Sequence, residues 1–169
     1  MKSRSRILSS WGNNMRAAII GTRKPDLPID QLIQLFRDKI PADAIVTSGN
    51  AEGVDQVSKA WNRNIQYLPW DGYNAKLGLG YKHCVAGGIK LYDQEIRKLW
   101  IYSAAFEPVV RKLVRRNCCI IAGKDGQNIV DVVYYYADEK DGVVSGGTKY
   151  GVELARSRGI PTYNLKESK

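Results

Sequence analysis

The chain contains few of the residues that build disulfide frameworks and metal sites. It has three cysteines and one histidine among 169 residues. An odd and sparse set of thiols is typical of reduced cysteines. Cys118 and Cys119 are adjacent in a predicted strand, so we expect their side chains on opposite faces, where they are poor joint ligands for one metal ion. Cys84 has only His83 beside it. The sequence therefore predicts neither a disulfide framework nor a metal site, and we expect no cofactor.

The chain also lacks a long apolar run. No stretch approaches the ~20 residues that a membrane-spanning helix requires. Residues 1–14 form a basic arm that begins Met1–Arg6, but only Ile7-Leu8 and then polar residues follow, which is not the apolar region of a secretory signal. We therefore expect no membrane partner and a soluble, cytoplasmic protein.

Acidic residues are outnumbered by basic ones. There are 17 Asp and Glu against 26 Lys and Arg, a net charge of +9. This balance favours an anionic partner, such as nucleic acid or a phosphorylated small molecule. The alternative is a basic surface that is simply solvated.

Predicted strands and helices alternate along the chain. This order predicts an α/β fold, a Rossmann-like, doubly wound and mostly parallel sheet with helices on both faces. We expect one domain over 15–169, with a helical insertion at about 71–107 that is a lid or a partner surface. The expected strands are 16–20, 44–47, 65–69, 118–123, 130–136 and 160–165, and the expected helices are 28–40, 53–62, 91–102, 108–116 and 148–158.

A turn with two basic residues follows the first predicted strand. In Gly21-Thr22-Arg23-Lys24-Pro25 the glycine permits a tight turn and the threonine offers a hydroxyl. Arg23 can donate a fork of hydrogen bonds to a phosphate, and Lys24 adds charge. The turn matches neither the Walker loop nor the GxGxxG pattern. It is either a phosphate-binding turn or an ordinary turn that carries two basic residues.

A second turn, Ser48–Asp55, follows the second predicted strand. Its small residues let a ligand approach the backbone, and the helix expected from Gly53 has an N-terminus that favours an anion. Glu52 and Asp55 would repel a phosphate, so we expect them to face a ribose hydroxyl, a base edge or the helix N-terminus. The alternative is a plain capped turn between a strand and a helix.

A third turn, Ser145-Gly146-Gly147-Thr148, leads into a helix with Tyr150 near its start, where the ring can stack on a base. The carboxyl ends of parallel strands lie at one edge of a sheet, so the three turns are expected to share one pocket. Trp70 and Tyr73 follow the third strand at the same edge. Arg115-Arg116-Asn117 precedes the strand predicted at 118–123, which assigns it to the opposite edge and to a structural or interface role.

In this order the motifs resemble the SLOG superfamily and are most similar to DprA-like proteins of bacteriophages. The pattern is strand–Gly-Thr-Arg-x-Pro, strand–Ser-Gly-x-Ala-x-Gly-Val-Asp, Arg-Asn–strand, then Ser-Gly-Gly-Thr–helix–Gly-Ile-Pro-x-x-Asn-Leu, over roughly residues 15–165. The resemblance implies a Rossmann-like sheet and a ligand that carries phosphate and ribose. Its members include single-stranded DNA-binding proteins, cytokinin-activating phosphoribohydrolases and domains that sense nucleotide-derived signals in antiphage immunity.

The hydrolase branch of this superfamily has a motif similar to Pro-Gly-Gly-x-Gly-Thr-x-x-Glu. Here the two glycines and Glu153 are kept, but the proline is absent and the inner Gly-Thr is not in place. This difference favours holding a nucleotide over cutting one. Glu52 and Glu153 are acid/base candidates only if the protein is an N-glycosidic hydrolase.

The first expectation is thus a phage-encoded nucleotide-binding protein that holds a phosphorylated nucleotide, or an ADP-ribose-like or cyclic signal, and so sequesters a host antiphage immune signal. A single-stranded DNA-binding recombination mediator and a nucleotide hydrolase are the alternatives. The basic arm and the insertion also predict a homo-oligomer. The residues expected to bind the ligand are Gly21, Thr22, Arg23, Lys24, Ser48, Gly49, Asn50, Glu52, Asp55, Gly146, Gly147 and Thr148.

Overall fold

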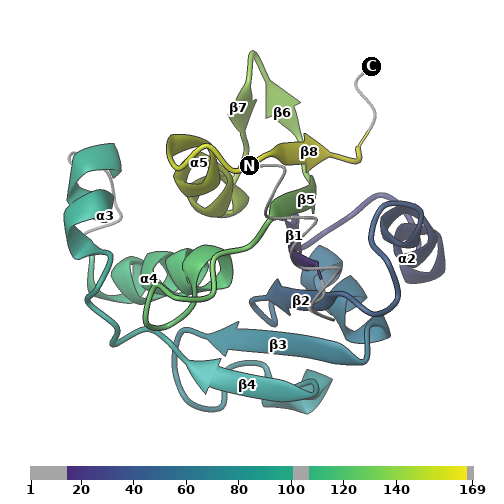
Figure 1. The fold of residues 1–169 in the computed structure, drawn as a ribbon, viewed down its shortest axis with the longest axis horizontal. Helices are drawn as coiled ribbons and strands as arrows, with labels where there is room; N and C mark the ends of the chain where they lie inside the picture. The colour runs from purple at the N-terminus through teal and green to yellow at the C-terminus, as the bar shows by residue number, and fades with distance from the viewer. Residues whose placement is uncertain (1–14, 101–106, 167–169) are drawn as a thin grey trace.

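The computed structural model describes residues 15–100 and 107–166, so the expected basic arm lies outside the described residues. A six-stranded sheet runs through the centre in the order β4-β3-β2-β1-β5-β8, and every neighbouring pair is parallel (Figure 1). This confirms the predicted α/β fold class. The strands are β1 (Arg16–Gly21), β2 (Ile45–Ser48), β3 (Arg63–Leu68), β4 (Lys82–Val85), β5 (Val132–Tyr136) and β8 (Thr162–Asn164).

Helices cover both faces of the sheet. The α-helix α2 (Ile29–Arg37) and the 3₁₀-helix η1 (Gly53–Ala60) pack on one face. On the other face lie α4 (Pro108–Ala122) and α5 (Thr148–Ser157), with α3 (Asp93–Trp100) beyond them. A short 3₁₀ turn, η2 (Ala75–Leu77), precedes β4, and a hairpin of β6 (Glu139–Lys140) and β7 (Val143–Val144) precedes α5.

The central strands are buried on both faces, which explains their continuous apolar sequence. Successive side chains of a strand point to opposite faces. In β1, Ala17 and Ile19 belong to the core beneath α2 and η1, and Ala18 and Ile20 belong to the core beneath α4 and α5. The side chains of the aromatic strand β5 divide between the two cores in the same way.

The prediction of a strand at 118–123 was wrong, because these residues form the last turns of α4. A short apolar run that is buried on all sides cannot be assigned to strand or helix from periodicity alone. Its length decides in favour of the helix: no Gly or Pro interrupts the chain between Pro108 and Gly123, and the helix ends at Gly123 with φ 82°. Asn117 therefore lies inside the helix.

The two adjacent cysteines consequently lie on a buried helix and not on the two faces of a strand. Cys118 is 1% exposed and Cys119 is 0% exposed. Burial raises the pKa of the Cys118 thiol and raises that of Cys119 to about 12, so both stay protonated at neutral pH. No set of three or more His, Cys, Asp and Glu in the described residues is arranged to hold a metal ion.

Two further elements were not expected. The segment 71–107 contains the edge strand β4 as well as α3. Three of the four β4 residues are exposed, so the sequence has no apolar pattern from which this strand could be predicted. Before α5, the chain turns back at Asp141 and Gly142, which both have positive φ, as a two-residue hairpin turn requires.

In the described part of the chain, no helix has the length and apolar character to cross a membrane.

The order of the strands creates a crevice at the carboxyl end of β1. From β1 the chain moves to β2, β3 and β4 on one side, and then returns across the sheet to β5 on the other side. Ligands of open α/β sheets bind at such a switch point, outside the carboxyl ends of the strands. The fold therefore predicts a site between the turns that follow β1 and β5.

We expect Gly53→Ala to destabilise the protein, because η1 begins in a conformation that only glycine adopts easily. Gly53 has φ +82°, and a Cβ there would lie 2.4 Å from the Thr22 carbonyl oxygen. The loss should be about 2 kcal/mol or more, measured by urea unfolding. Gly88→Ala is the control, since its Cβ meets no described heavy atom within 4 Å. Equal stability of the two variants would contradict this account.

Candidate functional site

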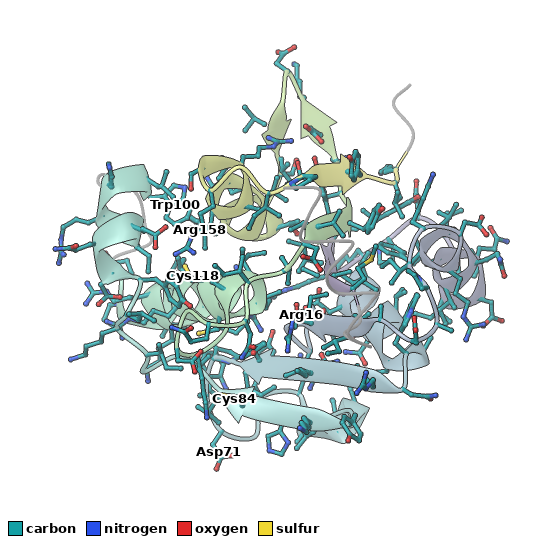
Figure 2. The ribbon with its side chains drawn as sticks, viewed as in Figure 1. Arg16, Asp71, Cys84, Trp100, Cys118 and Arg158 are labelled. Atoms are coloured by element: carbon teal, nitrogen blue, oxygen red, sulfur yellow. The ribbon has the colours of Figure 1, made fainter. Side chains whose placement is uncertain are left out.

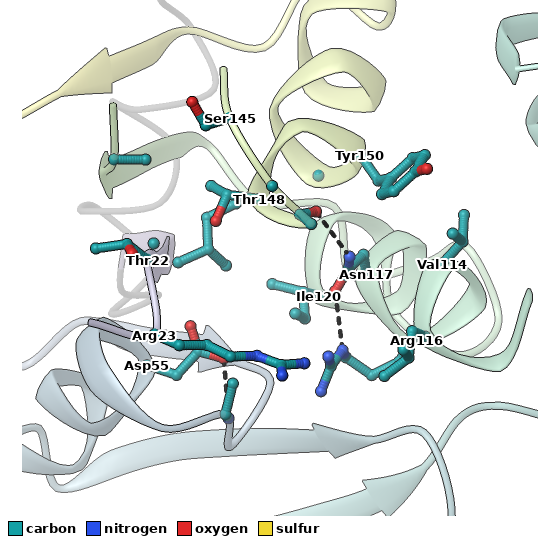
Figure 3. A pocket seen from close by; sticks show the side chains of 18 of the residues that line it. Thr22, Arg23, Asp55, Val114, Arg116, Asn117, Ile120, Ser145, Thr148 and Tyr150 are labelled. Carbon is teal, nitrogen blue, oxygen red and sulfur yellow. Dashed lines mark hydrogen bonds between the residues drawn. The ribbon is translucent and has the colours of Figure 1, made fainter. Parts of the chain in front are cut away.

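A pocket of about 440 Å³ opens at the predicted switch point, between the turn after β1, the start of η1, α4 and the start of α5 (Figure 3). The turn after β1 and the turn before α5 form opposite walls, and the turn after β2 contributes Ala51 and Asp55. The polar and charged residues that line the pocket are Thr22, Arg23, Lys24, Asp55, Arg116, Asn117, Asp138, Ser145, Thr148 and Tyr150.

The turn after β1 is shaped by close packing at Gly21. A Cβ at this residue would lie 2.4 Å from the Tyr136 carbonyl oxygen and 2.7 Å from the Cβ of Val54. The next amide, of Thr22, donates to the same Tyr136 oxygen at 2.9 Å. The turn is thus fixed to the ends of β5 and η1. Arg23 and Lys24 follow it as exposed side chains at the mouth of the pocket.

The turn after β2 is braced from within by Asp55. Its carboxylate accepts hydrogen bonds from the backbone amides of Gly49 and Ala51, each at 3.1 Å. Burial raises the pKa of this carboxyl, and the Arg116 charge acts in the opposite direction. Ser48 and Asn50 are each 0% exposed and support the turn from behind. The structure therefore brings Asp55 to the pocket, whereas Ser48, Gly49 and Asn50 lie outside its lining.

The turn before α5 is the most open of the three. A Cβ at Gly147 meets no described heavy atom within 4 Å, so the space beside this residue is free for a ligand. The side-chain amide of Asn117 donates to the Gly147 carbonyl at 3.3 Å and joins the turn to α4. The start of α5 lines the pocket, and the N-terminus of a helix favours a negative charge. Gly146, Gly147 and Thr148 all line the pocket, as do Gly21, Thr22, Arg23 and Lys24.

Arg116 and Asn117 are pocket residues that sequence reasoning placed at the opposite edge. The error follows from the strand predicted at 118–123: as residues of α4, both lie along the pocket wall. The apolar spacing Val110, Val114, Cys118 continues past Asn117 at the interval of a helix, and this signal indicates the correct assignment.

The Arg116 guanidinium is buried and ordered by its neighbours. The side chain is 5% exposed; Nη1 donates to the Gly49 carbonyl, and Nε donates to Asn117 Oδ1 at 2.8 Å. Its guanidinium carbon lies 5.4 Å from the centroid of the Tyr73 ring. Because a Cβ at Gly49 would lie 2.8 Å from Nη1, this glycine makes room for the arginine.

The Arg23 and Arg116 side chains point toward one another in the pocket (Figure 3). Burial lowers the pKa of Arg116, the Asp55 carboxylate opposes this shift, and the positive charge of Arg23 adds a smaller lowering effect. Two acidic residues also line the pocket, but each has other bonds: Asp55 with backbone amides, and Asp138 with Lys166 at 2.6 Å. The arrangement is therefore a cavity with two facing cations, suited to an anion.

The two glutamates considered for catalysis lie outside this pocket. Glu153 Oε1 accepts a hydrogen bond from Trp100 Nε1 at 2.6 Å, in the region between α3 and α5. The Trp100 ring is packed edge-on against Tyr150 at 4.9 Å, and Tyr150 lines the pocket. Glu52 is exposed and lines a second, smaller hollow beside the pocket.

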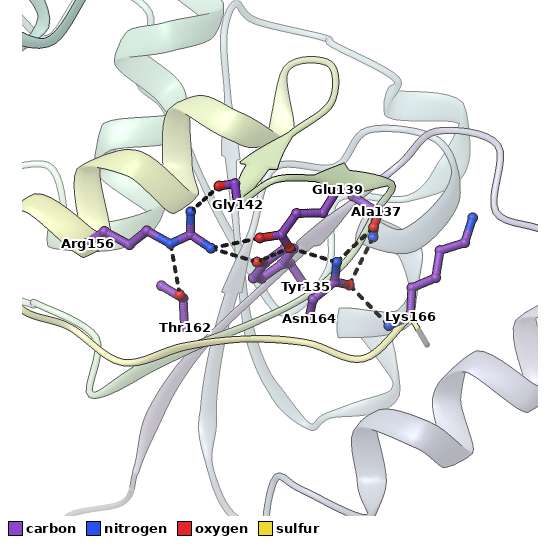
Figure 4. A network of polar contacts seen from close by, with 8 residues as sticks. All are labelled: Tyr135, Ala137, Glu139, Gly142, Arg156, Thr162, Asn164 and Lys166. Atoms are coloured by element: carbon purple, nitrogen blue, oxygen red, sulfur yellow. Dashed lines mark hydrogen bonds and ion pairs between the residues drawn. The ribbon is translucent and has the colours of Figure 1, made fainter. Parts of the chain in front are cut away.

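A polar network stabilises the hairpin of β6 and β7, which directly precedes Ser145 (Figure 4). Glu139 accepts from the Tyr135 hydroxyl at 2.7 Å, from Asn164 Nδ2 at 3.0 Å and from Arg156 Nη2 at 3.2 Å. These partners come from β5, β8 and α5, so one carboxylate ties the hairpin to three elements. These bonds lower the pKa of Glu139, the largest effect coming from the Tyr135 hydroxyl.

Comparisons with known proteins agree with the fold. No family model matches the sequence, and no curated protein matches it. One solved structure, described for the single-stranded DNA binding mode of DNA processing protein A from Helicobacter pylori, is similar with a TM-score of 0.57 and 24% sequence identity. The match covers 91% of this chain and 66% of that chain, so this chain spans about two thirds of its neighbour. The likeness supports a DprA-like, Rossmann-like fold; membership of the SLOG superfamily stays a prediction.

The Glu139 network predicts a loss of stability in acid. Since the pKa of Glu139 is lowered from 4.5, its contribution is complete above about pH 5 and is lost as the pH falls through the folded-state value. The unfolding free energy of Glu139→Gln should be lower than wild type at pH 7 and should approach it at about pH 3. Asp71→Asn, at an exposed position, is the control. A constant difference at every pH would contradict the assignment.

Proposed function

We propose that the pocket binds a nucleotide through its phosphate and that the protein holds this ligand without hydrolysing it. The observation that carries the proposal is the pair of guanidinium groups, Arg23 and Arg116, that face each other across the cavity. An anion between them would replace a repulsion by two sets of charge-assisted hydrogen bonds. The N-terminus of α5 lines the same cavity and favours an anion there.

The rest of the pocket has the chemistry that a nucleoside needs. Its volume of about 440 Å³ falls in the range of small-molecule sites, about 300–1,000 Å³. The wall formed by α4 is apolar, with Val110, Leu113 and Ile120, and suits a base. Thr148 offers a hydroxyl for the sugar. Phosphate, sugar and base thus each have suitable partners in one cavity.

Holding is favoured over hydrolysis because two of the nearby carboxylates, Asp55 and Glu153, already have partners, and Glu52 lines the second hollow and not this pocket. Asp55 accepts two backbone hydrogen bonds, and Glu153 accepts one from Trp100 outside the pocket. A general acid or base must reach the atom it serves, at about 2.6–3.2 Å or through one water. Neither carboxylate is arranged to do this for a ligand between the two arginines.

A second candidate function is binding of single-stranded DNA, which one comparison favours. The similar structure from Helicobacter pylori was described for that activity. The mouth of the pocket carries the exposed cations Arg23 and Lys24, and the chain has a net charge of +9. A strand that crosses this mouth would insert one nucleotide and leave its neighbours at the surface.

We expect Arg23→Ala to weaken nucleotide binding about tenfold or more, because it removes one of two charged phosphate partners. Isothermal titration calorimetry with a panel of nucleoside mono- and diphosphates measures the effect. Arg37→Ala, an exposed arginine in the last turn of α2, is the control and should bind like wild type. Arg23→Ala should not destabilise the free protein, since it also relieves the repulsion with Arg116.

The absence of binding across the panel, or an unchanged affinity of Arg23→Ala, would overturn the proposal. Gly147→Ala offers an independent check. Its Cβ meets no described heavy atom within 4 Å, so folding should be unaffected while a bound ligand loses space. Equal loss of binding and of stability would indicate a damaged fold instead.

For the second candidate, fluorescence anisotropy with a labelled oligothymidine should show micromolar binding that weakens steeply as salt is raised. Each phosphate contact released contributes about −0.7 to the slope of log K against log salt on a single strand. Arg23→Ala should weaken binding and reduce this slope. Absent or salt-independent binding would exclude the strand as a ligand and leave the free nucleotide.

A further inference from the structure

A second hollow adjoins the nucleotide pocket and has a different lining. Its volume is about 380 Å³, and it is lined by Arg23, Glu52, Trp70, Tyr73, Asn74 and Leu113. Arg23 and Leu113 line the first pocket as well, so the two cavities meet at these side chains. A ligand that leaves the first pocket past Arg23 therefore enters the second.

Trp70 gives this hollow an aromatic surface that is accessible from solvent. The residue is 37% exposed, and its ring stands edge-on to Tyr73 with centroids 5.3 Å apart. The Arg116 guanidinium in turn lies over the face of the Tyr73 ring. The indole is thus held beside the binding cations of the first pocket, whereas most large aromatic side chains of the described residues lie in the core.

The loop that carries Trp70 is fixed to the second glycine turn. Asn50 Nδ2 donates to the carbonyls of Tyr73 and Asn74, each at 3.3 Å, and Asn74 Nδ2 donates back to the Asn50 carbonyl at 3.1 Å. Asn50 and Asn74 both have positive φ, at 55° and 48°. This reciprocal pair keeps the aromatic wall at a constant position relative to the pocket, so little ordering is needed when a ligand binds.

We propose that the second hollow is a stacking site for a second base, so that the ligand consists of two nucleosides joined through phosphate. The proposal rests on the proposed function, because the first nucleotide occupies the neighbouring pocket. Arg23 then contacts the phosphate between the two units, Trp70 stacks on the outer base, and Glu52 accepts from a hydroxyl or an amino group. A dinucleotide and two successive residues of a strand share this chemistry.

The test compares ligands of one and two units. Calorimetry is carried out with the four 5′-deoxynucleoside monophosphates and with the matching 5′-phosphorylated homodinucleotides. For at least one base, wild type should bind the dinucleotide about tenfold more tightly than the mononucleotide, as expected for one base stacked on an aromatic side chain. Trp70→Ala should abolish this gain and leave the mononucleotide affinity unchanged, and Trp70→Phe should retain most of it.

Tyr81→Ala removes an aromatic side chain that is 63% exposed and outside the lining of the hollow, and should change neither affinity. If mononucleotides bind but dinucleotides bind no more tightly, or if Trp70→Ala weakens both equally, the second site is refuted and the nucleotide pocket stands. If no ligand of either length binds, both proposals fail. Oligothymidines of increasing length then separate the two sources: a gain that ends at two units indicates a free dinucleotide, and a further gain indicates a strand.

Discussion

The buried guanidinium of Arg116 is the interaction on which the candidate site depends. It donates to the carbonyls of Gly49 and Tyr67 at the ends of β2 and β3, and it bonds to Asn117, whose amide reaches Gly147 before α5. One side chain of α4 thereby connects both halves of the sheet's carboxyl edge. Burying a charge is costly unless it is hydrogen-bonded, and here the hydrogen bonds go to two backbone carbonyls and to the Asn117 side chain.

Small residues make this arrangement possible. Gly49 leaves room for the guanidinium, and Gly21 lets β1 approach β5 and η1, because a Cβ at either position would meet atoms closer than 3.0 Å. Gly147 differs, since the space beside it is open. The glycines of the turns therefore divide into two kinds. Some are required by the packing of the protein itself, and others leave a cavity for something else.

The fold class, and the glycine turns after β1 and before α5, could be predicted from the sequence because both depend on local signals. Alternating strands and helices, and glycines after apolar runs, are visible within a few residues. The role of Arg116 was not visible, because it depends on whether 118–123 is a strand or the end of a helix, and both are apolar and buried. The hairpin that contains β6 was missed for another reason: it is held by the partners of Glu139, which come from distant parts of the chain.

Charged side chains gather at the pocket, and two of them, Arg116 and Asp55, are buried. Burial lowers the pKa of Arg116 and raises that of Asp55, the attraction between these two charges opposes both shifts, and the positive charge of Arg23 lowers the pKa of Arg116 further. Elsewhere charges are matched: Arg115 pairs with Asp93 at 2.8 Å and Arg158 with Glu95 at 2.6 Å, which fasten α3 to α4 and α5 near Trp100 (Figure 2). Buried charged groups with shifted pKa values, beside a second cation, are typical of binding sites. An anion between the two arginines would offset their repulsion, so the charges of this cavity support the proposed ligand more directly than its shape does.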